Sequence, residues 1–409
     1  MSEDVLGLFQ GYGVELEYMI VQRDTLQVLP IADLLLRSPS GEPVEEVEHG
    51  RLCWSNELVL HVVELKTNGP APGLDGLDAE FGRQLAEINR RLAPLHGMLM
   101  PGAMHPWMDP ETETRVWPYG NRDIYHAYDR IFGCRGHGWS NLQSAHLNLP
   151  FADDAEFGRL HAAIRLVLPL LPALAAASPV MGGRVTGLLD NRLEVYRFNQ
   201  VSIPSITGQI IPEAAFTIEA YQRTILAAMY RDIAAEDPAG ILQKEWLNSR
   251  GAIARFDRQT IEIRLLDVQE CPQADLAILQ LLVAVLKELT AERWTSLASQ
   301  QAWHETILAD LLQRVLREGR LCLIEDERYL SMFGVENGRM TVGELWPLLA
   351  ERLIPSASPA WAVLQTLFDE GPLARRIVAA LGEAPSPGHL VDVYRQLCDC
   401  LQRGELFHA

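Results

Sequence analysis

Four segments of the chain alternate between apolar and polar residues, which is the pattern of a half-buried β-strand. They are residues 13–22 (GVELEYMIVQ), 58–67 (LVLHVVELKT), 144–149 (SAHLNL) and 260–268 (TIEIRLLDV). Between the second and third segments, residues 77–92 carry apolar side chains at helical spacing and predict an amphipathic helix. Because helices separate the strands along the chain, we predict an α+β fold. Its sheet is mixed or antiparallel, with helices packed on one side.

The last third of the chain has a different pattern. From Pro272 onward nearly every segment has helical periodicity, and prolines between 355 and 387 divide it into short helices. We therefore predict two regions. Residues 1–272 carry the strands, and residues 273–409 form a helical region that packs on the first region or extends it.

The balance of charge argues against one class of partner. The 409 residues include 35 Lys and Arg and 54 Asp and Glu, which gives a net charge of −19. A protein that binds nucleic acid needs surplus basic residues to neutralise phosphates, so we predict no nucleic-acid partner. A local basic site for a small anion such as a nucleotide remains compatible with this balance.

Two further features indicate the compartment. Residues 1–10 contain Glu3 and Asp4 and no basic stretch, unlike a signal peptide, and the longest apolar run, residues 166–177, is about half a membrane span. The six cysteines include no CxxC pair, which is typical of free thiols in a reducing cytosol. We predict a cytoplasmic protein with no membrane association.

Carboxylates occupy strand positions where a buried face would be apolar. Glu15 and Glu17 share one face of the first strand, and two like charges so close repel each other unless a cation or a proton lies between them. Glu64 lies within the second strand. Glu57, seven residues earlier, would face the other way in a regular strand, so the two converge only through a bulge or if Glu57 lies in the preceding loop.

The other two strands repeat this arrangement. His146 and Asn148 share a face of the third strand, and Glu262 and Arg264 share a face of the fourth. A solvated strand face would explain any one of these pairs. Four strands together indicate a site, and oxygen ligands with one imidazole suit Mg²⁺ or Mn²⁺. Because several such ions beside an arginine suit a polyphosphate, the pattern favours a divalent-metal nucleotide site.

The same residues resemble the motifs of the glutamate–cysteine ligase family, particularly its bacterial carboxylate–amine ligase branch. The motifs span residues 13 to about 272 in a matching order. They are GVELE at 13–17, Glu57 with VELKTNGP at 63–70, His-Pro at 105–106, HLN at 146–148, and IEIR at 261–264 followed by Asp267.

The resemblance implies a fold and a reaction. The fold is similar to the catalytic domain of glutamine synthetase and the guanido kinases, a curved and mostly antiparallel sheet with the active site on its concave face. Residues 1–272 would then be the catalytic region. The implied reaction uses ATP to convert a carboxylate, such as that of glutamate, into an acyl phosphate. An amine such as cysteine attacks it, giving an amide, ADP and phosphate.

By the same resemblance, the site residues receive roles. Arg264 would contact the γ-phosphate or the substrate carboxylate and, with Glu64 and Glu262, would be catalytic. Asn148 and Asn68 would orient substrate. The expected ligands of two or three Mg²⁺ ions, or of Mn²⁺, are Glu15, Glu17, Glu57, Glu64, His146 and Glu262.

Two arginines outside these motifs are further candidates. Arg192 could bind a substrate carboxylate and Arg255, which precedes the fourth strand, could reach a phosphate. A surface salt bridge is the alternative for Arg192.

Three alternatives to a glutamate–cysteine ligase stay open. No motif specifies cysteine, so the acceptor could be another amine. The chain could also be a non-catalytic paralogue that binds metal or nucleotide for regulation, or a glutamine-synthetase-like phosphotransferase acting on a guanidine or ammonia. The sequence likewise leaves open a homo-oligomer and the role of the helical tail.

Overall fold

A computed structural model of the chain describes residues 5–336 and 338–409. Its main sheet has eight strands, in the order β2-β3-β4-β1-β6-β10-β9, with β5 also paired to β1. Every pairing within this sheet is antiparallel, as predicted. The strands are β1 (Gly13–Gln22), β2 (Glu46–His49), β3 (Leu52–Asn56), β4 (Val62–Thr67), β5 (Gly97–Met100), β6 (Ser144–Pro150), β9 (Ala252–Arg255) and β10 (Thr260–Asp267).

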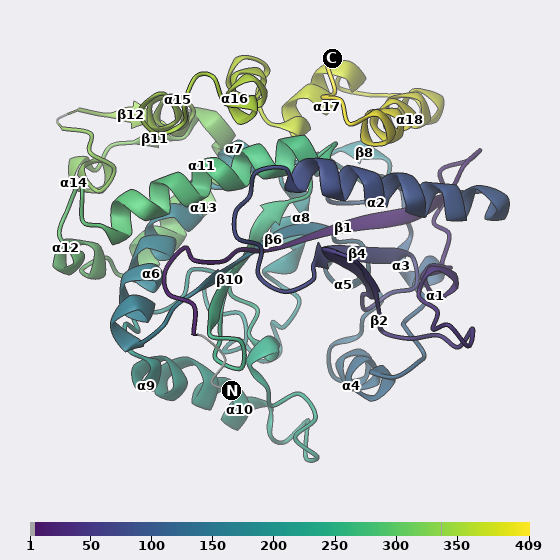
Figure 1. The fold of residues 1–409 in the computed structure, drawn as a ribbon, viewed down its shortest axis with the longest axis horizontal. Coiled ribbons are helices and arrows are strands. Elements are labelled where there is room, and N and C mark those ends of the chain that lie inside the picture. Colours follow the sequence, from purple (N-terminus) through teal and green to yellow (C-terminus); the bar gives the residue numbers. More distant parts are fainter. Residues whose placement is uncertain (1–4, 337) are drawn as a thin grey trace.

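Helices lie between and after these strands, and the predicted α+β fold is confirmed (Figure 1). Up to the fourth predicted strand they are α1 (Ala32–Leu35), α2 (Leu77–Leu92), α3 (Pro110–Glu113), α4 (Arg122–Phe132), α5 (His137–Ser140), α6 (Asp154–Val167), α7 (Pro172–Ala175), α8 (Asn191–Tyr196), α9 (Ile218–Tyr221) and α10 (Ala227–Ile233). The tail contains α11 (Pro272–Thr290), α12 (Leu297–Gln301), α13 (Glu305–Glu318), α14 (Glu327–Ser331), α15 (Val342–Leu353), α16 (Pro359–Glu370), α17 (Leu373–Leu381) and α18 (Pro387–Arg403).

One face of the sheet is apolar and lies under helices. Val14, Leu16 and Tyr18 of β1 are fully buried in the main core, as the alternation along this strand predicts. The expected apolar face of α2 is buried in the same core, and α11 packs against both α2 and α6. The polar side chains of β1 therefore face away from this helical layer.

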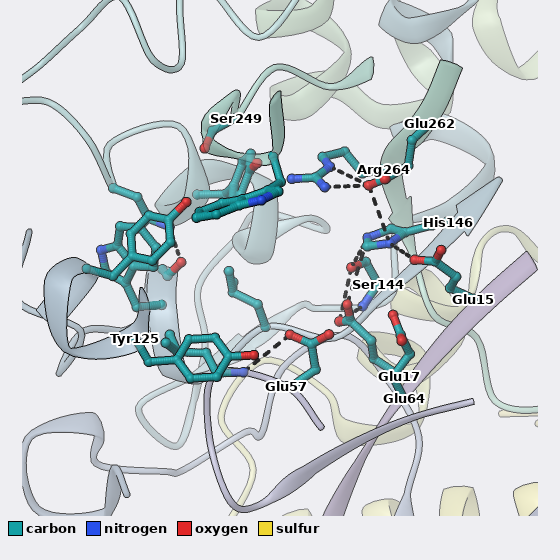
Figure 2. A pocket seen from close by; sticks show the side chains of 18 of the residues that line it. Glu15, Glu17, Glu57, Glu64, Tyr125, Ser144, His146, Ser249, Glu262 and Arg264 are labelled. Carbon is teal, nitrogen blue, oxygen red and sulfur yellow. Dashed lines mark hydrogen bonds and ion pairs between the residues drawn. The ribbon is translucent and has the colours of Figure 1, made fainter. Parts of the chain in front are cut away.

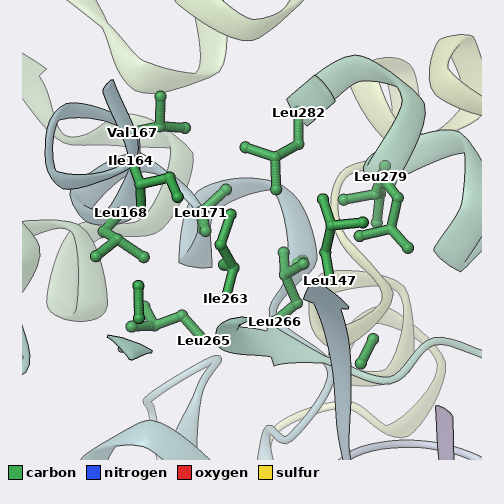
Figure 3. Packing of buried hydrophobic residues seen from close by; sticks show 14 of the residues in the cluster. Leu147, Ile164, Val167, Leu168, Leu171, Ile263, Leu265, Leu266, Leu279 and Leu282 are labelled. Carbon is green, nitrogen blue, oxygen red and sulfur yellow. The ribbon is translucent and has the colours of Figure 1, made fainter. Parts of the chain in front are cut away.

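The core joins the strands to the tail. Leu147 and Ile263, from β6 and β10, pack in the same buried cluster as Leu279 and Leu282 of α11 (Figure 3). Ile164 of α6 contributes to the same cluster. The hydrophobic core thus contains side chains from both sides of residue 272, and the division into two regions there stays a prediction.

The tail also covers part of the other face of β1. Glu15 and Glu17 are followed on their face by Met19 and Val21, which are buried in a second apolar cluster with α17 and α18. This face of β1 is therefore polar in its first half and apolar in its second. The helices α17 and α18 close the apolar half.

Some elements differ from the expected ones. The second predicted strand begins at Val62 rather than residue 58, because residues 57–61 connect β3 to β4. The strands β2, β3, β5 and β9 were not predicted. Of these, β3, β5 and β9 are short, fully buried runs, which periodicity does not distinguish from a piece of helix. The tail contains a small hairpin of β11 (Leu323–Ile324) and β12 (Met340–Thr341) among its helices, and β7 (Val180–Met181) with β8 (Arg184–Val185) forms another.

All six cysteines are buried and unpaired. Within the described residues, no helix has both the length and the apolarity that crossing a bilayer requires.

Truncating a core residue beneath the site tests this packing. Leu147 of β6 is fully buried in the core that the sheet forms with the helical layer. We expect Leu147→Ala to lower the free energy of unfolding by about 2–5 kcal/mol, because it removes buried methyl groups and leaves a cavity. Urea titration measures the change. The exposed Leu321 supplies the control, since Leu321→Ala should change stability by no more than about 0.5 kcal/mol.

Candidate metal and substrate site

The register of the sheet gathers the predicted polar residues on one face. Residues that pair across antiparallel strands place their side chains on the same side of the sheet. Figure 2 shows the resulting group of carboxylates around His146. The pairs are Glu15 with His146, Glu17 with Glu64, and Glu262 with Asn148.

His146 lies at the centre of this group. Its Nδ1 is 2.9 Å from Oε2 of Glu15 and 3.9 Å from Oε1 of Glu262. Its Nε2 is 2.8 Å from Oγ of Ser144. Ser144 in turn donates to Oε2 of Glu17 from both its backbone N–H, at 2.7 Å, and its hydroxyl, at 3.0 Å. One imidazole is therefore linked, directly or through Ser144, to three carboxylates from the two strands β1 and β10.

Glu64 and Glu57 complete this group of carboxylates. We call it the acidic wall, and it consists of Glu15, Glu17, Glu57, Glu64 and Glu262. Glu64 accepts a hydrogen bond from the hydroxyl of Ser55 and lies 3.4 Å from Nζ of Lys66, which also pairs with Glu46 at 2.7 Å. Glu57 lies in the loop that directly follows β3, and it lines the same cavity as Glu64. Because Glu57 lies in a loop, its side chain does not follow the alternation of β4. It can therefore face the same cavity as Glu64 despite the odd number of residues between them.

Two arginines flank the last carboxylate. Arg264 donates to Oε1 of Glu262, with Nε at 3.0 Å, and Nη1 of Arg255 is 3.3 Å from Oε2 of the same group. Arg255 also pairs with Asp257 at 3.2 Å. The two arginines thus engage both oxygens of Glu262 and hold it in place.

The electrostatics of the group are uneven. Burial alone would raise the pKa of Glu15, but the hydrogen bond and positive charge of His146, together with Lys66, outweigh it and lower the pKa to about 2. Burial disfavours a charged His146 as well. The hydrogen bond to Glu15 and the surrounding carboxylates outweigh that effect and raise the pKa of the imidazole.

Other carboxylates are left with excess negative charge around them. Burial, and then the charge of Glu15, raises the pKa of Glu64 to about 7. Burial and the charges of Glu17 and Glu64 raise the pKa of Glu57 well above its ordinary value. These carboxylates are held close together with too few cations of the protein to neutralise them.

A divalent cation fits this environment. Glu15, His146 and Glu262 offer ligand atoms within 4.8 Å of one another, and Glu17, Glu64 and His146 form a second such group. Carboxylate oxygens with one imidazole are a donor set for Mg²⁺ or Mn²⁺. The individual ligand assignments stay predictions.

The acidic wall borders a cavity of about 450 Å³. We call it the aromatic cavity, because its far side is formed by the rings of Tyr125, Tyr128, Trp139, Tyr196 and Trp246. These rings come from α4, α5, α8 and the loop before β9. In Figure 2 Tyr125 and Glu57 lie on one side of the open space, and Arg264 and Ser249 lie on the other. Three of the five predicted substrate residues line this cavity together with the acidic wall, although they lie far apart in the sequence from most of it: Arg192, Arg255 and Arg264.

A second cavity of about 510 Å³ lies beside the first. We call it the N-terminal cavity, because residues around Tyr12 and Gly13 line it. Asn148 lines it and donates to Oε1 of Glu15 at 3.1 Å. Asn68 lines it too, but its exposed side chain donates to the backbone of Gly50. The two predicted asparagines are thus in the neighbouring cavity rather than the aromatic one.

A β-bulge changes the face that the end of β10 presents. Between Ile263 and Leu266 the register with β6 shifts by one residue. Asp267 therefore pairs with Ser144 and shares its face, although its odd spacing from Glu262 would put it on the other face of a regular strand.

Arg192 stabilises this irregular segment. It donates to the backbone oxygens of Arg264, at 2.8 Å, and Leu265, at 3.3 Å, and pairs with Asp267 at 3.2 Å. Only 5% of Arg192 is exposed, so the surface salt bridge considered for it is wrong. Its ion pair is buried at the edge of the site.

The sequence interpretation missed several residues of this site. Ser144 and Lys66 each lie two residues from a predicted ligand on the same strand, so the face rule would have identified them. Ser55 is revealed only by its pairing with Glu64, which needs the register. The aromatic rings come from separate loops and short helices, and no sequence pattern unites them.

Comparison with known proteins identifies the family. The sequence model of glutamate–cysteine ligase family 2 matches residues 12–359. The chain belongs to this family. A relative from Archaeoglobus fulgidus, an uncharacterized protein, is 32% identical over 397 residues, which are 97% of this chain and 99% of the relative. The match confirms the family resemblance of the sequence motifs.

Two solved structures share the fold. The glutamate–cysteine ligase of Francisella tularensis, solved in complex with AMP, has a TM-score of 0.65 at 12% identity, covering 98% of this chain and 90% of that one. A bifunctional glutathione synthetase from Pasteurella multocida has a TM-score of 0.60 at 16% identity. This chain aligns over 97% of its own length and spans 52% of that protein.

The crowded carboxylates predict a stability that depends on divalent cations. Since the pKa of Glu64 is raised from 4.5 to about 7, its ionisation costs stability increasingly as pH rises through this interval and costs the full amount above it. In chelator at about pH 8, Glu64→Gln should therefore unfold at a higher temperature than the wild type. Added Mg²⁺ or Mn²⁺ should raise the unfolding temperature of the wild type more than that of the variant.

Scanning calorimetry with and without the cation measures both effects. Glu219→Gln, at an exposed position of α9, is the control and should respond to the cation as the wild type does. An equal response of wild type and Glu64→Gln would contradict cation binding at this wall.

Proposed function

We propose that this protein is an ATP-dependent carboxylate–amine ligase that forms an amide through an acyl phosphate, with release of ADP and phosphate. One observation carries the proposal. In a chain of glutamate–cysteine ligase family 2, the six predicted metal ligands and Arg264 all border a single cavity large enough for small-molecule substrates. Family membership makes ATP and an amino acid the expected substrates.

The proposed reaction brings anionic groups together, so it requires a site that holds a neutralising cation. A carboxylate is a poor electrophile, and transfer of the γ-phosphoryl group of ATP gives it a good leaving group. When bound, Mg²⁺ would supply the charge neutralisation that lets two anions, the triphosphate and the carboxylate, approach each other. The acidic wall would hold the cation through Glu15, Glu17, Glu57, Glu64, His146 and Glu262.

The protein's own groups would then orient the reactants. Arg264 can present its planar fork to the transferred phosphoryl group or to the carboxylate, because Glu262 and Arg255 keep it at the cavity wall. Arg192 lines the same cavity and would bind the substrate carboxylate. Its hydrogen bond to the backbone oxygen of Arg264 also holds that part of β10 in place. Aromatic rings on the far side would shield part of an acyl phosphate from water.

Glutamate is the proposed carboxylate and cysteine is one proposed amine. The rings of the aromatic cavity would surround the acceptor, and aromatic side chains can pack against many kinds of amine, so cysteine is not the sole candidate. Phosphate release from ATP with Mg²⁺ and L-glutamate, measured against a panel of amines that includes cysteine and ammonia, identifies the acceptor. Release should require glutamate and one amine together.

A lack of phosphate release across the panel, in a protein that binds Mg–ATP, would favour a non-catalytic paralogue. Formation of ADP without free phosphate, with a guanidine or ammonia as acceptor and no glutamate, would favour a phosphotransferase instead.

Neutralising single carboxylates tests the metal assignment. Glu64→Gln and Glu262→Gln should each lower Mg²⁺-dependent turnover of ATP at least about a hundredfold, because a neutral amide is a poor ligand for a hard cation. Circular dichroism should show a folded protein. Glu219→Gln should retain wild-type turnover. Wild-type rates in either cavity variant would refute the assignment of that residue.

A further inference from the structure

Arg258 differs from the other long cationic side chains that line the aromatic cavity. Lys66, Arg192, Arg255 and Arg264 each form an ion pair with a carboxylate. The guanidinium of Arg258 forms neither an ion pair nor a hydrogen bond with any residue in the described part of the chain, although it lines the cavity. It is therefore the cation that can bind an anionic ligand without first breaking a pair.

The backbone around Arg258 is held in place while its side chain is not. Arg258 lies in the hairpin that joins β9 to β10, and its N–H donates to the carbonyl of Arg255 at 3.1 Å. Gln259 follows in the left-handed region, with φ of 52°, which turns the chain into β10. The neighbouring carboxylate of Asp257 is paired with Arg255. An exposed, unpaired guanidinium thus projects from a defined turn.

The position of Arg258 is shared by two cavities. It lines both the aromatic cavity and the N-terminal cavity, and Glu15 and Lys66 are the other residues common to both. An anion near Arg258 would therefore lie at the junction of the cavities, next to a carboxylate of the acidic wall. A ligand that extends from one cavity to the other must pass this junction.

A triphosphate matches this junction in charge. Divalent cations there would share their charge between the phosphates and the carboxylates of the acidic wall, and a planar guanidinium binds phosphate oxygens through two parallel hydrogen bonds. Arg192 and Arg255 already bind buried carboxylates, so contact with a phosphate would compete with those ion pairs. The guanidinium of Arg258 has no ion pair in the described part of the chain, so the whole group is available to the triphosphate.

We propose that Arg258 binds the triphosphate of the nucleotide where the two cavities meet. The inference rests on the proposed function, because that function supplies the nucleotide. It adds a residue outside the motifs of the sequence and gives it a role that can be measured without knowing the acceptor amine.

Calorimetric titration of the full chain with Mg²⁺ and ATP, inorganic triphosphate or adenosine tests the inference. We expect Arg258→Ala to weaken ATP and triphosphate about tenfold to a hundredfold, the usual effect of losing a charge-assisted hydrogen-bond pair, and to leave adenosine unchanged. The affinity of Arg258→Lys for ATP and triphosphate should lie between those of the wild type and Arg258→Ala, because lysine keeps the positive charge but lacks the planar guanidinium. Arg223→Ala, which removes an exposed arginine of the 222–226 segment, is the matched control and should bind like the wild type.

Several results would overturn the inference. They are unchanged affinity for triphosphate in Arg258→Ala, an equal loss in Arg223→Ala, or a loss that is the same for adenosine. A raised KM for the carboxylate substrate with an unchanged KM for ATP would place Arg258 on the other substrate instead. A lower unfolding temperature with full ATP affinity would make it a structural residue.

Binding measurements on the wild type distinguish a failure of this inference from a failure of the proposed function. If the wild type binds neither Mg–ATP nor triphosphate, the proposed function fails and the inference fails with it. If the wild type binds both and Arg258→Ala does so equally, only the inference fails.

Discussion

Repulsion among buried carboxylates is the constraint on which the site and its surroundings depend. Glu15, Glu17, Glu64 and Glu262 lie on one face of the sheet, and Glu57 reaches the same cavity from a loop. His146 and the arginines beside Glu262 neutralise part of this charge, which explains why the pKa of Glu15 falls while those of Glu57 and Glu64 rise. A divalent cation would neutralise the remaining negative charge. The same close approach of carboxylates thus lowers stability in the absence of a cation and supplies the oxygens that would bind one.

The opposite face of the same strands offsets that cost. Val14, Leu16, Leu147 and Ile263 are buried against α2, α6 and α11, and this apolar packing fixes the register of the sheet. A slip of one residue would turn every carboxylate toward the core and every leucine toward the cavity, so the register is strongly specified. Helices of the tail contribute to this packing, although they carry none of the predicted ligands. Part of the chain beyond the motifs is thus needed to hold the motifs in place.

The strands that alternate were predictable from the sequence, because period-two patterning reports directly which side chains share a face. The fold class and the residues Glu15, Glu17, His146 and Glu262 follow from that rule. The rule fails where the backbone is irregular. It could not place Glu57, which lies in a loop, or Asp267, whose face is set by a bulge, and it gave no sign of β3 or β5, whose residues are all buried. The aromatic rings were equally out of reach, since only the folded chain brings their segments together.

The arrangement of the two cavities bears on how a two-step ligase would work. Both cavities meet at Glu15, Lys66 and Arg258, so groups approaching from either side come together beside the acidic wall. This arrangement suits the proposed reaction through an acyl phosphate, in which phosphoryl transfer and attack by the amine would occur at the same carboxylate. The two walls of the aromatic cavity differ accordingly. In the proposed reaction the acidic wall would serve the phosphoryl transfer that every acceptor requires. The rings on the far side of the cavity include none of the predicted metal ligands, so a change in their shape would alter the space for the amine while leaving those carboxylates in place.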